Sequence, residues 1–243
     1  MRLLVHFHVY YPEQLPYFLK RLRRIRGVDW DLYVTGKEET MPAIRRLKPD
    51  ARYLAVENVG YDIWPFIAVL KAVRLEDYDY ILKLHTKNKA PKFIQLNGIY
   101  LPRYRWRNLL VTALLGSGKR FSRALEKASQ GLACQDLLHK RLSKKAPTDN
   151  ALLREEAARI GLALKGGSFC AGTMFIARAE PFRFLQGAPL DAEFFRSEAG
   201  THLSGSPAHV YERILSLVVS AAGGRIVPIV THPLASAWKH LLV

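Results

Sequence analysis

The spacing of apolar residues in the first quarter of the chain switches repeatedly between the strand period and the helix period. Residues 3–10 (LLVHFHVY), 30–35 and 51–56 are short, β-rich and apolar, which predicts three strands. Within residues 15–25 the apolar side chains recur every three or four positions, and residues 38–47 also fit a helix. The order strand, helix, strand, helix, strand predicts a parallel sheet with right-handed crossovers.

A fourth apolar stretch ends in a run of polar residues. Residues 81–84 predict a buried strand, and His85, Thr86, Lys87 and Asn88 follow it directly. The carboxyl ends of strands in an open α/β sheet border the ligand crevice. A ring nitrogen, a hydroxyl, an ammonium group and an amide suit a phosphate-bearing ligand at that place. An ordinary basic turn would have the same composition.

The junction after the third predicted strand carries an amide, a glycine and a carboxyl group, at Asn58, Gly60 and Asp62. Gly60 allows backbone conformations that other residues adopt with difficulty, and Asp62 stands where it can cap the next helix. Because neighbouring parallel strands deliver their loops to one edge, this junction is predicted to meet His85 and Lys87. There Asn58 and Asp62 would bond a ribose or a base edge, although capping alone also explains Asp62.

The second half of the chain continues the alternation with longer helices. Its pattern predicts helices over residues 103–127 with a break at 116–118, over 151–160 and over 206–222. Ser206 as cap and Pro207 at the first position mark the start of the last helix. Residues 137–145 are basic and predict an exposed loop. Residues 168–178 (SFCAGTMFIAR) predict one strand, in which Gly172 lets backbone approach a ligand closely.

The charge of the chain predicts an anionic partner. Its 37 Lys and Arg against 21 Asp and Glu leave a net charge of +16. A nucleotide, a nucleic acid and an acidic membrane face all fit such a charge. The polar face of the helix predicted over residues 15–25 is basic, and is expected either to be solvated or to contact anionic lipid.

Length and cysteine content favour one soluble domain. With 49% apolar residues over 243 positions, the chain can bury a sizeable core. Cys134 and Cys170 are its two cysteines, which favours a reduced, cytoplasmic setting and a pair of buried thiols. No run approaches the roughly 18 apolar residues of a membrane span, and no signal-peptide pattern leads the chain. We therefore expect a soluble protein, at most peripheral to a membrane.

Four short motifs occur along the chain in a fixed order. Residues 58–66 have the form Asn-x-Gly-x-Asp-Ile-x-Pro-Phe, and residues 83–87 the form Lys-x-His-Thr-Lys. Trp-Arg at 106–107 precedes Leu-Leu-Gly-Ser at 114–117, and Ala-Gly-Thr-Met-Phe stands at 171–175. In these motifs and their order, over roughly residues 1 to 230, the chain resembles the rhamnan synthesis protein F family of bacterial polysaccharide glycosyltransferases.

The resemblance implies a fold and a reaction. The fold would be α/β, of the Rossmann-like GT-A type, with a mostly parallel central sheet flanked by helices. Residues 1–243 would form a single domain with a nucleotide-binding half, about 1–90, and an acceptor or catalytic half, about 91–243. The protein would move rhamnose or a related hexose from a nucleoside-diphosphate sugar, by the family name deoxythymidine diphosphate-rhamnose. The acceptor would be a lipid-linked cell-surface glycan at the inner face of the bacterial cytoplasmic membrane.

Transfer of this kind needs positive charge at the departing diphosphate and a base for the acceptor hydroxyl. The sheet-edge argument and the resemblance together give these donor-binding residues: Asn58, Gly60, Asp62, His85, Thr86, Lys87, Arg107, Gly172, Thr173, His209, Glu212 and Arg213. Many such enzymes place a metal-binding Asp-x-Asp where this fourth strand ends in His-Thr-Lys. We therefore expect Lys87, with Arg107, to do much of the electrostatic work of a metal ion.

The family resemblance also suggests the base and leaves two other functions open. Glu198 is predicted as the base, with Asp191 behind it, and a single base favours inversion. No cofactor is certain beyond the donor substrate: a divalent metal, Mg²⁺ or Mn²⁺, stays open without support from an Asp-x-Asp, and His85 is a weak ligand for it because no carboxylates converge on it in the sequence pattern. The family's Asp-Gly-Thr is replaced by Ser-Gly-Ser at 204–206, which leaves an inactive transferase-like scaffold open. The charge leaves a nucleic-acid-binding protein open, although no known nucleic-acid module is recognisable.

Overall fold

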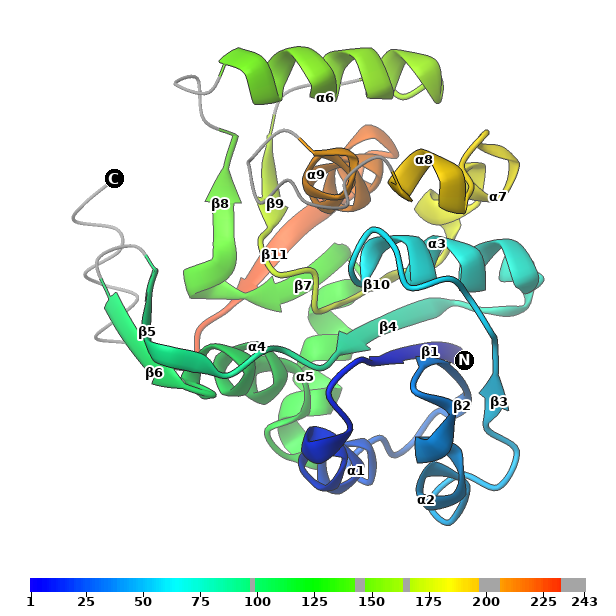
Figure 1. Ribbon diagram of the computed structural model, residues 1–243, viewed down its shortest axis with the longest axis vertical. Coiled ribbons are helices and arrows are strands. Elements are labelled where there is room, and N and C mark those ends of the chain that lie inside the picture. The colour runs from blue at the N-terminus through cyan, green and yellow to red at the C-terminus, as the bar shows by residue number, and fades with distance from the viewer. Residues whose placement is uncertain (97–98, 143–146, 164–166, 197–205, 233–243) are drawn as a thin grey trace.

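The computed structural model describes residues 1–96, 99–142, 147–163, 167–196 and 206–232, which form a sheet of seven strands with helices on both faces (Figure 1). The spatial order is β11-β7-β10-β4-β1-β2-β3. The strands are β1 (Arg2–Val9), β2 (Asp29–Gly36), β3 (Arg52–Tyr53), β4 (Tyr80–His85), β7 (Gly131–Gln135), β10 (Phe175–Arg178) and β11 (Arg225–Ile229). All neighbours are parallel except β10, which runs antiparallel to β4 and β7. The α/β class with a mostly parallel central sheet is confirmed.

Helices cover the two faces of the sheet in separate layers (Figure 1). One layer contains α1 (Leu15–Leu22), α2 (Met41–Arg45), α4 (Arg105–Leu115) and α5 (Gly118–Ala128). The other contains α3 (Ile63–Ala72), α6 (Pro147–Arg159), α7 (Phe184–Gly187), α8 (Ala192–Arg196) and α9 (Pro207–Ala221). Short 3-10 helices lie at Pro12–Gln14, Glu38–Thr40, Leu75–Asp77, Asp136–Leu138 and Glu180–Phe182. Two antiparallel two-stranded sheets complete the fold: the hairpin of β5 (Ala90–Leu96) and β6 (Ile99–Arg103), and the pair β8 (His139–Arg141) and β9 (Ser168–Cys170), between which the chain forms α6.

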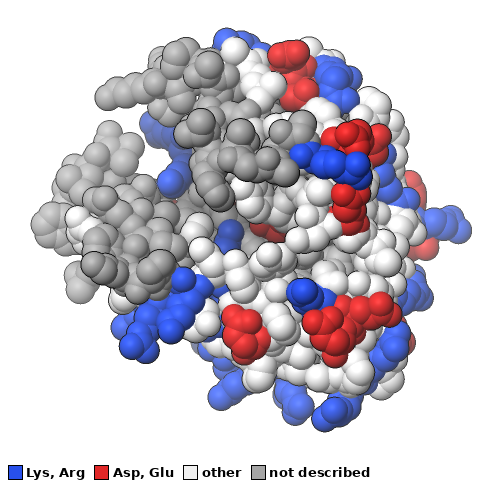
Figure 2. Space-filling model, in the orientation of Figure 1, with Lys and Arg blue, Asp and Glu red and all other residues white. Residues whose placement is uncertain are grey.

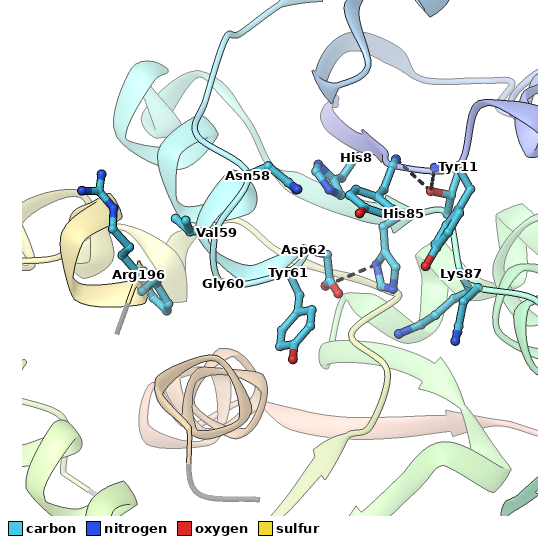
Figure 3. Close-up of a pocket in the computed structure, with 14 residues that line it drawn as sticks. His8, Tyr11, Asn58, Val59, Gly60, Tyr61, Asp62, His85, Lys87 and Arg196 are labelled. Atoms are coloured by element: carbon cyan, nitrogen blue, oxygen red, sulfur yellow. Dashed lines mark hydrogen bonds and ion pairs between the residues drawn. The ribbon is translucent and has the colours of Figure 1, made fainter. Parts of the chain in front are cut away.

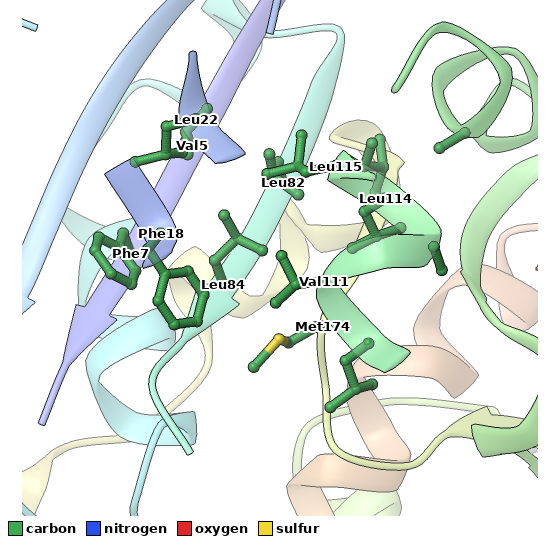
Figure 4. Packing of buried hydrophobic residues seen from close by; sticks show 14 of the residues in the cluster. Val5, Phe7, Phe18, Leu22, Leu82, Leu84, Val111, Leu114, Leu115 and Met174 are labelled. Atoms are coloured by element: carbon green, nitrogen blue, oxygen red, sulfur yellow. The ribbon is translucent and has the colours of Figure 1, made fainter. Parts of the chain in front are cut away.

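Alternation along the central strands separates an apolar face from a partly polar one. Val5 and Phe7 of β1 pack toward α1 and α4, where the rings of Phe7 and Phe18 lie 4.8 Å apart (Figure 4). Leu82 and Leu84 of β4 complete this dry side. Since successive strand residues point to opposite faces, the even-numbered residues of β1 and the odd-numbered residues of β4 face α3. That second face carries the polar residues of the site.

Several predicted elements differ in extent from the observed ones. The third strand, predicted over 51–56, is limited to Arg52–Tyr53 at the edge of the sheet, because the chain pairs with one neighbour there and then leaves toward α3. The helix predicted over 38–47 is divided into a 3-10 turn and α2, whose first turn contains Pro42. The break at 116–118 is confirmed, with Ser117 Oγ accepting the Arg120 amide at 3.1 Å.

Two predictions in the second half are wrong. The single strand predicted over 168–178 is two strands, β9 and β10, joined by a turn in which Gly172 and Thr173 have φ of +79° and +46°. Within the predicted exposed loop 137–145, Leu137 and Leu138 are buried, and β8 follows them and pairs with β9. Positions 143–146 lie outside the described residues.

The thiols of Cys134 and Cys170 are both buried, as predicted. Within the part of the chain that the structure describes, no helix combines the length and apolar character required to cross a membrane.

Two glycines with left-handed backbone give a matched test of the fold. Gly36 ends β2 at φ +97°, and a Cβ there would lie 2.3 Å from the carbonyl oxygen of Val9, whereas Gly27 (φ +75°) has open space around it. Gly27→Ala should lower the free energy of unfolding by about 1–2 kcal/mol through backbone strain alone. Gly36→Ala should cost about 1–3 kcal/mol more, because the β1–β2 pair must move apart. Urea denaturation measures the unfolding free energy of both variants. Equal losses would contradict the close approach of Gly36 to the Val9 carbonyl.

Candidate functional site

The α3 side of the two central strands carries a ladder of basic side chains. The parallel register sets His6 beside Lys83 and His8 beside His85. All four side chains are buried, with exposed fractions of at most 3%. His6 Nε2 and His8 Nδ1 both lie within hydrogen-bond distance of Thr35 Oγ1 on β2, at 2.9 and 3.0 Å. Basic groups this deep require an acidic partner or a neutral state.

The acidic partner is Asp62, at the first position before α3. Lys83, whose side chain is fully buried, donates a hydrogen bond from Nζ to Asp62 Oδ2. The same ammonium donates to Thr173 Oγ1 at 3.0 Å, and the Thr173 hydroxyl donates to Asp62 Oδ2 at 2.5 Å. His85 Nδ1 lies 3.3 Å from the same carboxylate oxygen. The Asp62 side chain therefore bonds β4 and the turn before β10. It forms no capping hydrogen bond on α3, so the capping role that the sequence allowed is not observed.

The protonation states follow from burial and from these neighbours. Burial acts to raise the pKa of Asp62, but His85, Lys83 and Lys87 together hold it well below its usual range. Burial places the pKa of His85 well below 6.5; Asp62 opposes that shift, whereas Lys87 and Lys83 add to it. His85 is therefore neutral at pH 7. The positive charge that meets Asp62 directly at that pH belongs to Lys83.

The loops that carry these groups are held in left-handed conformations. Gly60 and Tyr61 have φ of +61° and +55°, and a Cβ on Gly60 would lie 2.8 Å from the ring of Phe195. A larger residue at position 60 would therefore push α8 away from the junction. On the opposite side, Glu212 of α9 accepts a hydrogen bond from the Gly172 amide at 2.6 Å, which fixes the turn that presents Thr173.

A second set of contacts fixes the backbone at the end of β4. Thr86 Oγ1 accepts hydrogen bonds from the amides of Tyr10 and Tyr11, at 2.9 and 3.0 Å. Gln14 Nε2 donates to the Lys87 carbonyl oxygen, and Gln14 Oε1 accepts a hydrogen bond from the Lys87 amide at 3.3 Å. The Lys87 ammonium lies 4.6 Å from the centre of the Trp106 ring. Thr86 is therefore a backbone support, whereas Lys87 presents a charge held by an aromatic face.

A cavity of about 560 Å³ opens where these segments meet (Figure 3). Its walls come from the end of β1, the junction before α3, the end of β4 and α8. The lining residues are His8, Tyr10, Tyr11, Asn58, Val59, Gly60, Tyr61, Asp62, His85, Thr86, Lys87, Asn88, Phe195 and Arg196. Asp62 and His85 face each other across one wall, and Lys87 projects on the far side of His85 (Figure 3). The volume is in the range of small-molecule sites.

Half of the predicted donor-binding residues line this cavity: Asn58, Gly60, Asp62, His85, Thr86 and Lys87. Thr173 lies beneath it through its bond to Asp62, and Gly172 and Glu212 hold that turn. His209 is bonded to Ser206, with its ring 6.0 Å from that of Tyr61. Arg213 donates to the His209 carbonyl at 2.9 Å. His209 therefore contacts the cavity wall through Tyr61, whereas the bond of Arg213 lies within α9.

Two of the predicted residues have other contacts, and one lies outside the described residues. Arg107 is 7% exposed, its guanidinium lies between the rings of Tyr17 and Tyr104, and it donates to Gln14 at 3.3 Å, behind the Lys87 segment. Asp191 accepts the Phe194 amide at 2.9 Å, so it caps α8 and is absent from the cavity lining. Glu198, the predicted base, lies outside the described residues.

Other residues at the site were not predicted from the sequence. His8 lines the cavity, and His6 is buried beside it on the same Thr35 hydroxyl. Both are polar residues inside an apolar strand at a spacing of two, which places them on one face, and this spacing was the available signal. The aromatic walls Tyr10, Tyr11 and Phe195 had no comparable signal, because their position depends on tertiary packing. Among the described residues, no three His, Cys, Asp or Glu side chains are grouped to hold a metal ion.

Removing the buried ammonium should cost far more than removing an exposed one. Lys83→Met leaves the Asp62 carboxylate without its main cation, and we expect a loss of about 3–5 kcal/mol in unfolding free energy. Lys48→Met is the matched control, since the Lys48–Asp50 pair is partly exposed and should contribute about 0–1 kcal/mol. Denaturant titration at pH 7 compares the two, and similar losses would contradict the importance of the buried pair.

The buried imidazoles should make stability fall in mild acid. Burial lowers the pKa of His8 from 6.5 to about 4. Between these values the unfolded chain binds a proton that the folded protein does not, so unfolding free energy falls as pH decreases from 6.5 to 4. Over this pH range the shifted pKa of His8 should lower the unfolding free energy by about 3 kcal/mol. His8→Asn should reduce the slope of stability against pH by about one proton, and an unchanged slope would contradict a neutral buried ring.

With this geometry established, comparison with known proteins identifies the family. The chain is 30% identical over 210 residues to the "Uncharacterized protein WxcX" of two strains of Xanthomonas campestris pv. campestris, and the match covers 77% of this chain and 26% of the relative. It thus spans about a quarter of the length of these relatives. The solved structure of 4-diphosphocytidyl-2C-methyl-D-erythritol synthase is 13% identical, with a TM-score of 0.42 over 99% of this chain and 97% of that one, a likeness that supports no functional conclusion.

The model of a family described as rhamnan synthesis protein F matches residues 1–223, nearly the whole chain. Its match includes all four segments that form the cavity. The chain belongs to the rhamnan synthesis protein F family.

Proposed function

We propose that the protein is a GT-A type glycosyltransferase that moves a sugar from a nucleoside-diphosphate donor onto a growing polysaccharide. One observation supports this most strongly. The cavity at the carboxyl ends of β1 and β4 combines a lysine, a neutral histidine and amide groups in a chain of the rhamnan synthesis family. Ligands of open α/β sheets bind at this edge, and a diphosphate needs the positive charge.

In this proposal Lys87 contacts the donor diphosphate. It is half-buried on the cavity wall and its ammonium rests on Trp106, so it is preorganised for an anion. Arg107 acts indirectly, by holding Gln14 and through it the Lys87 backbone. The nucleoside would lie toward Asn58 and the two tyrosines that follow β1. From this position Lys87 stabilises the negative charge that develops on the leaving diphosphate.

The acceptor hydroxyl must lose its proton as the new bond forms. Asp62 is the carboxylate on the described cavity wall, and its bonds to Lys83 and Thr173 make it a structural group. We therefore keep Glu198 as the proposed base, and a single base predicts inversion. His85 Nε2 is buried and has no hydrogen-bond partner among the described residues. Because the ring is neutral, this nitrogen can accept a hydrogen bond, and a substrate hydroxyl would reach it only if a covering side chain moved aside.

The family name suggests the finer identities that complete the proposal. We propose rhamnose or a related hexose as the transferred sugar, deoxythymidine diphosphate-rhamnose as the first donor to test, and a lipid-linked glycan as acceptor. Such an acceptor would place the reaction at the inner face of the cytoplasmic membrane. A transferase with these substrates needs no nucleic acid. The Ser-Gly-Ser at 204–206 is the feature that favours the rival function, an inactive scaffold that binds donor without turnover.

Donor binding and turnover test the proposal together. A nucleotide sugar at 100 times its Kd should raise the unfolding free energy by about 2.7 kcal/mol, detected as an increase in Tm across a panel of donors. Lys87→Met should weaken binding roughly 10- to 100-fold, the equivalent of one charge-assisted contact. Lys37→Met is the matched control, because exposed Lys37 follows β2 at the same sheet edge but does not line the cavity.

The outcomes separate the candidate functions. Stabilisation by a donor, with transfer of labelled sugar to a glycan acceptor, supports the enzyme. Stabilisation without transfer to any of the acceptors tested would favour the scaffold. Stabilisation by oligonucleotides and by no nucleotide sugar would contradict the proposal.

A further inference from the structure

The outer surface of the α1–α4–α5 layer carries a band of basic side chains that runs away from the cavity. We define this basic band by six exposed residues: Lys20, Arg23, Arg103, Arg105, Lys119 and Arg123. Lys20, in the last turn of α1, and Arg23, its C-cap, are three positions apart on one side of the helix end, and Lys119 and Arg123 share one face of α5. Lys and Arg side chains lie at the lower left and along the bottom of Figure 2, where Figure 1 shows α4 on the left and α1 at the bottom.

Two contacts fix the band at both ends. At the cavity end, Arg107 of α4 donates to Gln14, just before α1. At the other end, Arg24 donates to the carbonyl oxygens of Leu115, at 2.7 Å, and Gly116, between α4 and α5. Helices α1 and α4 therefore run side by side in the same direction. Over eleven residues α4 spans about 16 Å, so the charges are held on one rigid surface.

The charge of the band is not neutralised by the chain itself. None of the six side chains forms an ion pair with a described residue. From position 87 to position 125 the sequence contains no Asp or Glu. The nearest acids along these elements are Glu13 and Glu126, one at each end. A rigid surface with uncompensated positive charge attracts an extended anionic partner.

The cavity end of the band also carries an aromatic residue. The β5–β6 hairpin leads directly into Arg103 and α4, and Tyr100 of β6 is 57% exposed beside it. Its neighbour Leu101 is buried in the core, so the hairpin base is attached to the body of the protein. A tyrosine with arginines on one side is the composition of a surface that lies in the interface of a bilayer.

We propose that the basic band docks the protein on an anionic lipid bilayer, with α1 and α5 against the headgroups. Lys87 and Asn88 on the cavity wall precede the hairpin, so docking would bring the cavity mouth beside the membrane surface. This inference extends the proposed function, since it names the surface that brings a lipid-linked acceptor to the site. Its test needs no transfer activity, so it stands or falls separately.

Sedimentation with vesicles tests the docking. The full chain should bind vesicles of 30% phosphatidylglycerol in phosphatidylcholine at 0.1 M salt, and should bind neither pure phosphatidylcholine vesicles nor anionic vesicles at 0.5 M salt. The triple variant Arg23→Glu, Lys119→Glu, Arg123→Glu should bind on the order of 100-fold more weakly, because each basic residue near the surface contributes about 1 kcal/mol.

A second triple variant controls for total charge. It carries the same three reversals at exposed positions elsewhere on the surface: Arg74→Glu, Arg154→Glu and Arg183→Glu. This control should retain binding within about threefold of the parent, because its substitutions lie away from the band. Circular dichroism and Tm confirm that both variants are folded.

Three results would overturn the inference. The first is no binding of the parent to anionic vesicles at 0.1 M salt, and the second is equal loss in both triple variants. The third is tighter binding of the band to a single-stranded oligonucleotide than to vesicles presenting the same concentration of phosphate, which would assign the surface to nucleic acid.

Discussion

The buried ion pair of Asp62 and Lys83 joins the three segments on which the site depends. It links the start of α3 to the middle of β4, and through Thr173 it includes the turn before β10. Removing two charges from water costs several kcal/mol for each ion, and hydrogen bonds must offset that cost. Both donors to Asp62 come from other elements, so the carboxylate is satisfied only when all three segments are in place. We infer that the pair specifies geometry more than it adds stability.

The same pair controls the charge of the cavity. The charge of Lys83 is neutralised by Asp62, so Lys83 contributes little positive charge toward a ligand. Burial lowers the pKa of His8 and of His85, so both rings are neutral at pH 7. The lysine that faces the cavity is therefore Lys87, held on Trp106 outside the buried ladder. Arg196, the other cation of the described lining, is paired with Glu57 and Glu193, so the site presents Lys87 to an anionic ligand beside the uncharged ring of His85. This division of roles suits a substrate with a charged diphosphate and neutral sugar hydroxyls.

Much of the fold and part of the site could be predicted from sequence, for identifiable reasons. Strand and helix periods are local, so β1, β2, β4 and α9 were predicted close to their observed positions, and the start of α3 was expected directly after Asp62. Parallel strands share an edge, so residues near 58–62 and 85–87 were expected to meet, and they do. The turn at Gly172 and Thr173 divides an apolar run without a proline or a polar cluster, and the antiparallel direction of β10 has no local signature.

The most direct test of the account is a crystal structure of the protein with a bound nucleoside-diphosphate sugar. In that complex the diphosphate should lie within hydrogen-bond reach of Lys87, and the ligand should fill the cavity bounded by Asn58, Asp62 and His85. The Asp62–Lys83 pair should be the same with and without ligand. A ligand bound at the opposite edge of the sheet, near Arg178, or an Asp62 released from Lys83 to hold the ligand, would contradict it.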